Sequence, residues 1–154
     1  RQHILNMIFF IGEQSNNKLQ QECELFQIAE RIAQLHGKNV PDKAVGKIDR
    51  LLLKARDYIP DNVQLELSLD DISQHASLSK YHFLRMFRRQ FGITPHQYSL
   101  NCRLNRAREA LSLGTPINDI VYEYGFSDLS HFNRRFKPIY GTTPHQYQKN
   151  IFCS

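Results

Sequence analysis

The chain of 154 residues has little cysteine: three residues, at positions 23, 102 and 153. A disulfide framework needs an even number of cysteines and a zinc site needs closely spaced ones, and neither pattern is present. Unpaired thiols are typical of a reducing compartment, so we expect a cytoplasmic protein without a bound metal or other cofactor.

The chain also lacks long apolar runs. The longest, at residues 8–11, is far too short to cross a bilayer, and no cleavage site of small residues follows it as in a signal peptide. We therefore expect no membrane partner. The first residue is Arg1 and not Met, so we expect further residues upstream of it.

Catalytic motifs are the third absence. The sequence has no Gly-rich phosphate loop, no GxSxG, no HExxH and no Cys/His pair at the spacing of metal ligands. These absences exclude the enzyme classes that depend on such motifs, and we expect a protein that is not an enzyme.

What the sequence does contain is one stretch that occurs twice. Residues 79–98 read SKYHFLRMFRRQFGITPHQY, and residues 128–147 read DLSHFNRRFKPIYGTTPHQY. A shift of 49 positions aligns three aromatic residues and the closing GxTPHQY segment of the two copies. Short apolar segments, Leu69-x-x-Ile72 and Ile117-x-x-Ile120, precede them. Two copies are too few for a solenoid, so each predicts a short helix, a tight turn and a longer helix, the helix-turn-helix order.

Hydrophobic periodicity predicts the remaining elements. We expect a strand at residues 3–11 and helices at 19–35, 42–59 and 95–113, the last about 28 Å long. A Gly and a Pro near residue 40 indicate a boundary between residues 1–40 and 41–154. Helix starts are predicted at Ser68, Thr94-Pro95, Thr115-Pro116 and Thr143-Pro144. From residue 42 onward we predict an all-α fold, two helix-turn-helix units joined by a long central helix.

The predicted helix at residues 19–35 carries an apolar stripe that is wide for a lone helix. The stripe needs either a missing domain or a second copy of itself, so we expect a homodimer through this helix. Its members are Leu25, Ile28, Ile32 and Leu35.

The net charge of +5 is distributed unevenly. Residues 79–108 hold seven basic residues and no acidic one, and residues 128–150 hold four basic residues against Asp128 alone. Residues 1–62 are nearly balanced, with nine basic and eight acidic residues. A basic excess confined to the longer helices of two helix-turn-helix units indicates nucleic acid as the partner. The alternative, a solvated basic face, accounts more easily for one such helix than for two.

Side chains opposite the aromatic stripe of each long helix are candidates for contact with DNA bases, because the aromatic stripe faces the core. An α-helix fits the major groove, where arginine binds guanine O6 and N7 and apolar groups meet the thymine methyl. Arg85 and Arg134 occupy matched positions and are the predicted base readers. Leu84 is predicted to be an exposed apolar residue that meets a thymine methyl. The further candidates are Asn133 for adenine, and Tyr81, Ser130 and His131 for bases or phosphate.

Basic residues later on the same helices are predicted phosphate contacts, which position a protein without specifying a sequence. These are Arg88, Arg89, Arg135 and Lys137. The helix starts at Pro95 and Pro144 offer free N–H groups to phosphate, and His96 and His145 beside them contact phosphate or are simply exposed. Successive major grooves recur about every 34 Å on one DNA face, so the central helix could let residues 79–91 and 128–140 enter consecutive grooves.

Two longer motifs combine these features. The first copy contains Leu78-Ser79-x-x-x-Phe83-x-Arg85-x-Phe87 and Gly92-x-Thr94-Pro95-x-x-Tyr98. The second contains Gly125-Phe126-Ser127-Asp128-x-Ser130-His131-Phe132-x-Arg134-x-Phe136 and Gly141-x-Thr143-Pro144-x-x-Tyr147. With these motifs, the region from about Ile48 to Tyr147 resembles the DNA-binding domain of AraC-type bacterial transcriptional regulators.

The resemblance implies a sequence-specific regulator that binds double-stranded DNA in the bacterial nucleoid, with RNA polymerase as a further partner. It implies base contacts from Tyr81, Leu84 and Arg85, and from Leu129, Ser130, His131 and Arg134. Leu129 is not on the exposed face of the helical projection, so the two interpretations disagree there. The resemblance also implies that residues 1–36 are the last strand and the dimerisation helix of an N-terminal β-barrel domain. A small-molecule effector would bind the missing barrel and not this part of the chain.

Two other functions stay open at this point. In one, the chain is a protein-interaction module that dimerises through residues 19–35 and binds DNA only non-specifically. In the other, it is a DNA-repair methyl acceptor, which can share this helical domain but needs an activated cysteine beside it.

Overall fold

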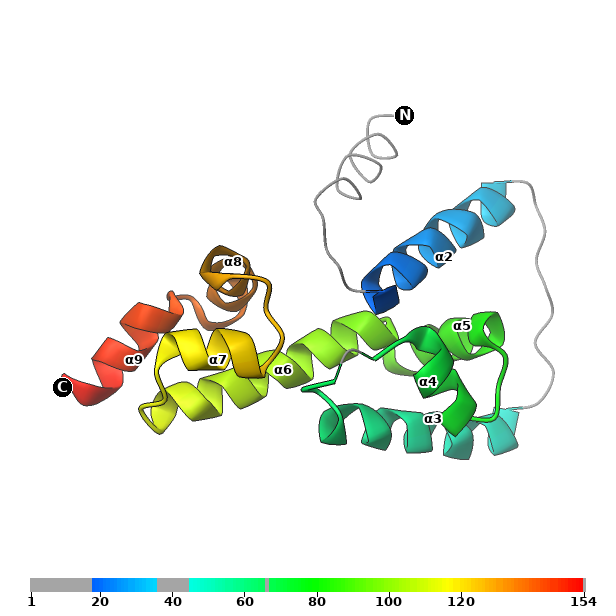
Figure 1. Cartoon of the computed structure of the whole chain (residues 1–154). Coiled ribbons are helices and arrows are strands. Elements are labelled where there is room, and N and C mark those ends of the chain that lie inside the picture. The colour runs from blue at the N-terminus through cyan, green and yellow to red at the C-terminus, as the bar shows by residue number, and fades with distance from the viewer. Residues whose placement is uncertain (1–17, 36–44, 66, 154) are drawn as a thin grey trace. The chain divides into compact units, whose positions relative to one another are not determined.

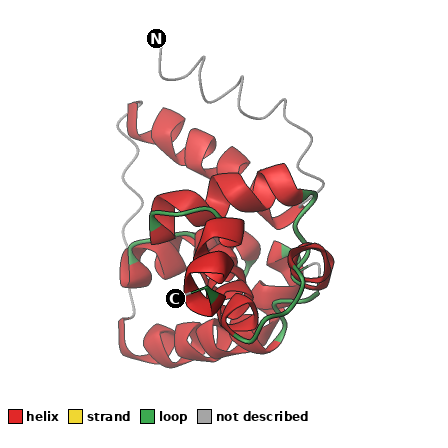
Figure 2. Ribbon diagram, turned by 90° about the vertical axis from the view of Figure 1, so that its left-hand side faces the viewer, coloured by secondary structure: helices red, strands yellow, loops and turns green. Residues whose placement is uncertain are grey.

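The computed structural model describes residues 18–35, 45–65 and 67–153. Within these ranges all regular secondary structure is helical, as Figures 1 and 2 show, which confirms the all-α prediction for this part of the chain. The predicted strand at residues 3–11 and the predicted boundary near residue 40 lie outside the described residues. The helices are α2 (Lys18–Leu35), α3 (Val45–Asp61), α4 (Leu69–His75), α5 (Lys80–Phe91), α6 (Pro95–Ser112), α7 (Ile117–Glu123), α8 (Leu129–Tyr140) and α9 (Pro144–Phe152).

The chain forms two compact units, and each contains one copy of the repeated long helix. Unit 1 comprises Arg1–Tyr58 and Leu67–His96, and it contains α2, α4 and α5. Unit 2 comprises Ile59–Glu66 and Gln97–Ser154, and it contains α7, α8 and α9. None of the described helices is both long enough and apolar enough to cross a bilayer.

The two units use the same aromatic packing. In unit 1 the rings of Phe83 and Phe87 lie 5.4 Å apart, and in unit 2 those of Phe132 and Phe136 also lie 5.4 Å apart. All four side chains are fully buried, because residues four apart share one face of a helix. Burial of a phenylalanine side chain contributes about 1.5–3 kcal/mol, so these pairs fix which face of α5 and α8 is turned inward. The unit 2 core adds Leu104, Ala107, Ala110, Leu111, Ile120 and Phe126.

Matched turns orient the long helices. Both end at a left-handed glycine, Gly92 (φ 75°) and Gly141 (φ 78°), whose N–H groups donate to carbonyls of the last helical turn at 2.8 Å. The turns that precede them also match, with Ser77 at φ 51° before α5 and Gly125 at φ 67° before α8. A left-handed conformation strains a serine but not a glycine. The first turn is therefore strained where the second is not.

The predicted helix caps are confirmed at two positions and wrong at a third. Ser68 forms a capping box with Asp71, and Thr143 forms one with Gln146. Thr115 does not cap α7, because Pro116 occupies the N-cap position and supplies no side-chain hydrogen bond. A Thr-Pro pair is thus compatible with two helix starts one residue apart, and local sequence does not choose between them.

Candidate nucleic-acid interface

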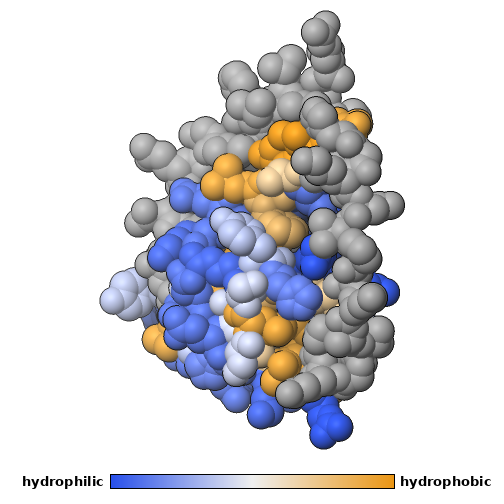
Figure 3. Space-filling view, turned by 90° about the vertical axis from the view of Figure 1, so that its right-hand side faces the viewer, coloured by the Kyte–Doolittle hydropathy of each residue, from blue (hydrophilic) through white to orange (hydrophobic). Residues whose placement is uncertain are grey.

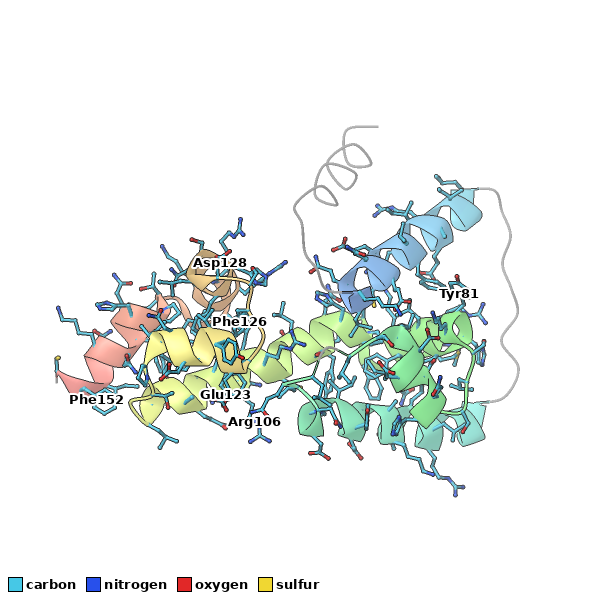
Figure 4. The ribbon with its side chains drawn as sticks, viewed as in Figure 1. Tyr81, Arg106, Glu123, Phe126, Asp128 and Phe152 are labelled. Carbon is cyan, nitrogen blue, oxygen red and sulfur yellow. The ribbon has the colours of Figure 1, made fainter. Side chains whose placement is uncertain are left out.

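Helix α8 presents a polar and basic face opposite its buried aromatic pair. Asp128 begins the helix, with Oδ1 accepting a hydrogen bond from the His131 backbone N–H at 2.7 Å. This bond holds the pKa of the Asp128 carboxyl below its usual value, so the cap stays negatively charged at the positive end of the helix dipole. Figure 4 shows Asp128 at the start of α8 and Phe126 in the turn before it. The predicted contacts Leu129, Ser130, Arg134 and Lys137 are exposed, and His131, Asn133 and Arg135 are half-buried.

The structure differs from the helical projection at Leu129, which the projection placed off the exposed face of α8. Its side chain is 43% exposed. It is the first residue of α8, and the fully buried Phe132 begins the aromatic stripe one turn later. An angle on a helical wheel does not predict burial at a helix end, because packing partners need not extend that far.

His131 is a neutral imidazole in this arrangement. Burial lowers its pKa most, and the guanidinium groups of Arg135 and Arg134 lower it further. Its Nε2 accepts a hydrogen bond from Nε of Arg135 at 3.4 Å, and its ring meets the edge of Phe126 at 5.9 Å. Among the described residues, its buried Nδ1 has no hydrogen-bond partner. Because Nε2 accepts, the remaining proton belongs on Nδ1.

A hollow of about 380 Å³ lies beside this face in unit 2. Three predicted contacts, Leu129, Asn133 and His145, line it together. Its other lining residues are Pro116, Ile117, Asn118, Thr143 and Gln148. Asn118 and Gln148 were not among the contacts predicted from the sequence. Both residues lie near the Thr-Pro helix starts, which was the only sequence feature that could have marked them as lining residues. Nothing in the local sequence indicates that the starts of α7 and α9 line the same hollow.

Helix α5 in unit 1 is arranged differently, because α2 lies on its outer face. Leu84 was expected to be exposed, and this expectation is wrong: the side chain is 1% exposed. Tyr81 is largely exposed but stacks on Phe26 of α2, with ring centroids 5.9 Å apart. Figure 4 shows Tyr81 on the side of α5 that faces α2. Of the other predicted contacts, Arg88 and Arg89 are exposed, and Arg85 and His96 are half-buried.

Arg85, the predicted reader of this helix, lies beside a histidine of its own helix. Its Nη2 is 3.3 Å from Nδ1 of His82, three residues earlier. The matched Arg134 on α8 is exposed. The two predicted readers therefore have different surroundings, although their positions in the repeat are the same.

Cys23 and Cys102 lack the properties of a reactive thiol. Burial raises the pKa of the Cys23 thiol to about 12, and burial also raises the pKa of Cys102. A methyl acceptor needs a thiol whose pKa is lowered, so neither residue fits that role. Within the described ranges, no group of three or more His, Cys, Asp or Glu side chains is placed to hold a metal ion.

Comparison with known proteins agrees with this geometry. A family model described as a helix-turn-helix domain matches residues 72–150. The regulator YbfI of Bacillus subtilis is 39% identical over 74 residues, which are 48% of this chain and 27% of that protein. MarA of Escherichia coli is 32% identical over 71 residues, 46% of this chain and 56% of that protein. The fold and the repeated unit thus define a helix-turn-helix protein of the DNA-binding class.

A solved structure identifies the type. It is a transcriptional regulator from Chromobacterium violaceum with an AraC-type DNA-binding domain, 30% identical, with a TM-score of 0.63. The match covers 68% of this chain and 94% of that one. The chain belongs to the helix-turn-helix family of AraC-type transcriptional regulators. It spans only 27% and 35% of the length of YbfI and of LumQ from Photobacterium leiognathi, the latter 36% identical over 86 residues.

Proposed function

We propose that the chain reads a two-part site in double-stranded DNA through two helix-turn-helix units, α4–α5 and α7–α8. Helices α5 and α8 enter the major groove, and α6 joins the units. The repeated aromatic packing and the matched turns support two equivalent units. In the relatives the matched region is part of regulators of transcription, so we propose the same role here, in the bacterial cytoplasm and with RNA polymerase as a further partner.

The observation that carries this proposal is the two-sided character of α8. Phe132 and Phe136 are fully buried on one side, and Ser130, Arg134 and Lys137 are exposed on the other. Side chains on a helix anchored in this way lie in a fixed order along a groove, which is what direct readout of bases requires. We assign Arg134 to a guanine, and Leu129 to a thymine methyl.

Phosphate contacts complete the interface. Lys137 is exposed on the same face of α8 as Arg134, one turn further along. His145 is exposed in the first turn of α9, at the positive end of the helix dipole, where an anion is favoured. We propose that both positions meet the DNA backbone and fix the register of α8.

We test the proposal by selecting bound sequences from random duplex DNA with the unchanged chain, Arg85→Ala and Arg134→Ala. Arg106→Ala is the matched control, because Arg106 is an exposed arginine outside α5 and α8. We expect two short blocks about one helical turn apart. Each of the first two variants should relax one block at a cost of ~1–3 kcal/mol, and the control should relax neither.

Binding without any enriched sequence, with a strong salt dependence, would refute direct readout. It would favour the alternative, an interaction module with only non-specific affinity for DNA.

We also propose that α2 dimerises the protein. Its stripe residues Leu25, Ile32 and Leu35 are 61%, 50% and 75% exposed, and Ile28 is half-buried. Figure 3 shows apolar side chains gathered on this end of unit 1, at the level of α2. In sedimentation, Ile32→Glu should lower the mass to that of a monomer, and Leu113→Glu, at an exposed position outside α2, should not. An unchanged mass for Ile32→Glu would refute this interface. By its resemblance, α2 would be the last helix of an N-terminal effector domain.

A further inference from the structure

Three contacts hold α2 on α5. Nη1 of Arg88 lies 3.0 Å from Oε2 of Glu30, and Nζ of Lys80 lies 3.1 Å from Oε1 of Glu22. Between these ion pairs the rings of Phe26 and Tyr81 stack at an interplanar angle of 19°. The other carboxylate oxygen of Glu22 accepts a hydrogen bond from the Leu69 backbone N–H at 3.0 Å, which ties α2 to the start of α4.

The contacts follow one stripe on each helix. On α2, Glu22, Phe26 and Glu30 are four residues apart and so share one face. On α5, Lys80 and Arg88 are eight residues apart, and Leu84 lies midway between them. Leu84 is 1% exposed, and it lies between the two cations that pair with α2. The two stripes therefore face each other over two helical turns.

Two residues of this stripe on α5 are among the contacts with DNA that the sequence predicts. Leu84 is a predicted base contact and Arg88 a predicted phosphate contact, and the predicted base contact Tyr81 stacks on α2 beside them while it stays 69% exposed. The major groove is about 12 Å wide, and one helix with its side chains is about 10–12 Å across. Helix α5 cannot enter the groove while α2 lies on it. The carboxylate of Glu30 also pairs with Arg88, a cation that is predicted to meet phosphate, whereas Lys80 is shared between Glu22 and Asp70 of α4, the latter at 2.6 Å.

We propose that α2 is an autoinhibitory element, which keeps the first helix-turn-helix unit out of the major groove until DNA or a change in α2 displaces it. The proposal rests on the proposed function. The second unit differs at one matched position: Asn133, which corresponds to the buried Leu84, is half-buried. The protein in this state engages DNA first through α8, and reading by α5 follows the release of α2.

The ion pairs between α2 and α5 are partly exposed to solvent, so other ions can displace them. The side chains of Arg88 and Glu30 are 45% and 26% exposed to solvent, and those of Lys80 and Glu22 are 32% and 21% exposed. Salt and competing anions screen pairs of this kind, so DNA phosphates can replace the glutamates.

Cys23 provides a direct probe of the α2 position. It follows Glu22 on α2, is 1% exposed, and its thiol interacts with Thr94 and the backbone of His96, beyond α5. In the full chain with Cys102→Ser and Cys153→Ser, a thiol reagent then reports on this residue alone. A saturating duplex that carries both selected blocks should speed its modification at least about 10-fold, and a scrambled duplex should not. An unchanged or slower rate at saturation would overturn the proposal.

Variants that weaken the contact between α2 and α5 provide a second test of the autoinhibition. Phe26→Ala with Glu30→Gln removes the stack and one ion pair. Glu24→Gln with Gln27→Ala is the matched control, because it changes the same charge and two neighbouring α2 positions outside the contact stripe. We expect the first variant to bind the two-block duplex about 10-fold more tightly, since a larger fraction of molecules is open to DNA. The control should bind like the unchanged chain. Equal helical circular dichroism would show that both variants fold.

The outcomes separate the two proposals. If both variants read the α8 block but the α5 block and the rate at Cys23 do not change, the inhibition is refuted and the proposed function stands. If neither variant nor the unchanged chain selects any sequence, the proposed function is refuted, and the inhibition with it.

Discussion

Replacing Arg103 should destabilise unit 2 although the residue is basic and belongs to a charge-rich stretch. Its side chain is only 9% exposed. Nε donates a hydrogen bond to the Val63 carbonyl at 3.0 Å, and Nη2 donates one to the Leu65 carbonyl at 3.2 Å. The guanidinium also lies against the turn before α8, since a Cβ added to Gly125 would be 3.5 Å from Nη1. Arg103 thus connects the segment after α3 to the turn that positions α8.

The magnitude follows from the two hydrogen bonds. A hydrogen bond from a charged donor contributes about 1.5–3 kcal/mol, and the bond to Val63 is buried whereas water can partly replace the one to Leu65. Arg103→Ala should therefore lower the free energy of unfolding by about 2–4 kcal/mol. Arg103→Lys should lose about half of this, because one ammonium cannot span both carbonyls in the geometry of a guanidinium.

Urea denaturation followed by circular dichroism measures the effect. With a slope of about 2 kcal/mol per molar urea, the midpoint should fall by about 1–2 M for Arg103→Ala. Arg106→Ala is the control, since Arg106 is 53% exposed and its nearest carboxylate, on Glu109, is 3.9 Å away. If Arg103→Ala and Arg106→Ala had the same midpoint, the assignment of Arg103 as a structural residue would be wrong.

Three further predictions concern local features. Ser77→Gly should raise the stability by about 0.5–1 kcal/mol in urea denaturation, because it relieves the left-handed strain that the second copy avoids; a lower midpoint would contradict this. The folded pKa of His131 lies below its ordinary value of 6.5, so its contribution to stability is complete above pH 6.5 and falls as the pH drops through the folded pKa. His131→Gln should flatten the fall in the urea midpoint between pH 7.5 and 5, and an unchanged slope would exclude His131 as its origin. Thr143→Ala should cost about 1 kcal/mol, because it removes the capping box of α9, and an unchanged thermal midpoint would show that the cap does not contribute.

The long helices and their ends were predictable from the sequence. Residues 79–91 and 128–140 were expected, and the structure has α5 at Lys80–Phe91 and α8 at Leu129–Tyr140. The signals are local ones, aromatic residues four apart and a glycine that accepts the left-handed conformation. The exposure of Arg134 on α8 agrees with its predicted place opposite the aromatic stripe. Its contact with a base stays a prediction.

The surroundings of individual side chains were less predictable. Arg103 was counted among the seven basic residues of the stretch 79–108, but its partners are carbonyls 38 and 40 residues earlier in the chain. Thr115 looked like the caps at the other helix starts, yet α7 begins one residue later. An arginine can be a surface cation or a buried hydrogen-bond donor, and a threonine can cap a helix or precede it. In both cases the sequence neighbours suggested one role, and the residues that lie nearby in the fold determined the other.

The sequence by itself determined the duplicated helical unit and the inward face of each long helix, because period and turn chemistry act within a few residues. Tertiary structure alone decided which of the two outward faces is accessible. Leu84 and Asn133 occupy the same position in the repeat, but only Leu84 is buried, and α5 beside it carries ion pairs to α2 residues 58 positions away. No periodicity within the repeat encodes that contact, since it arises from charge and ring complementarity between segments that meet only after folding.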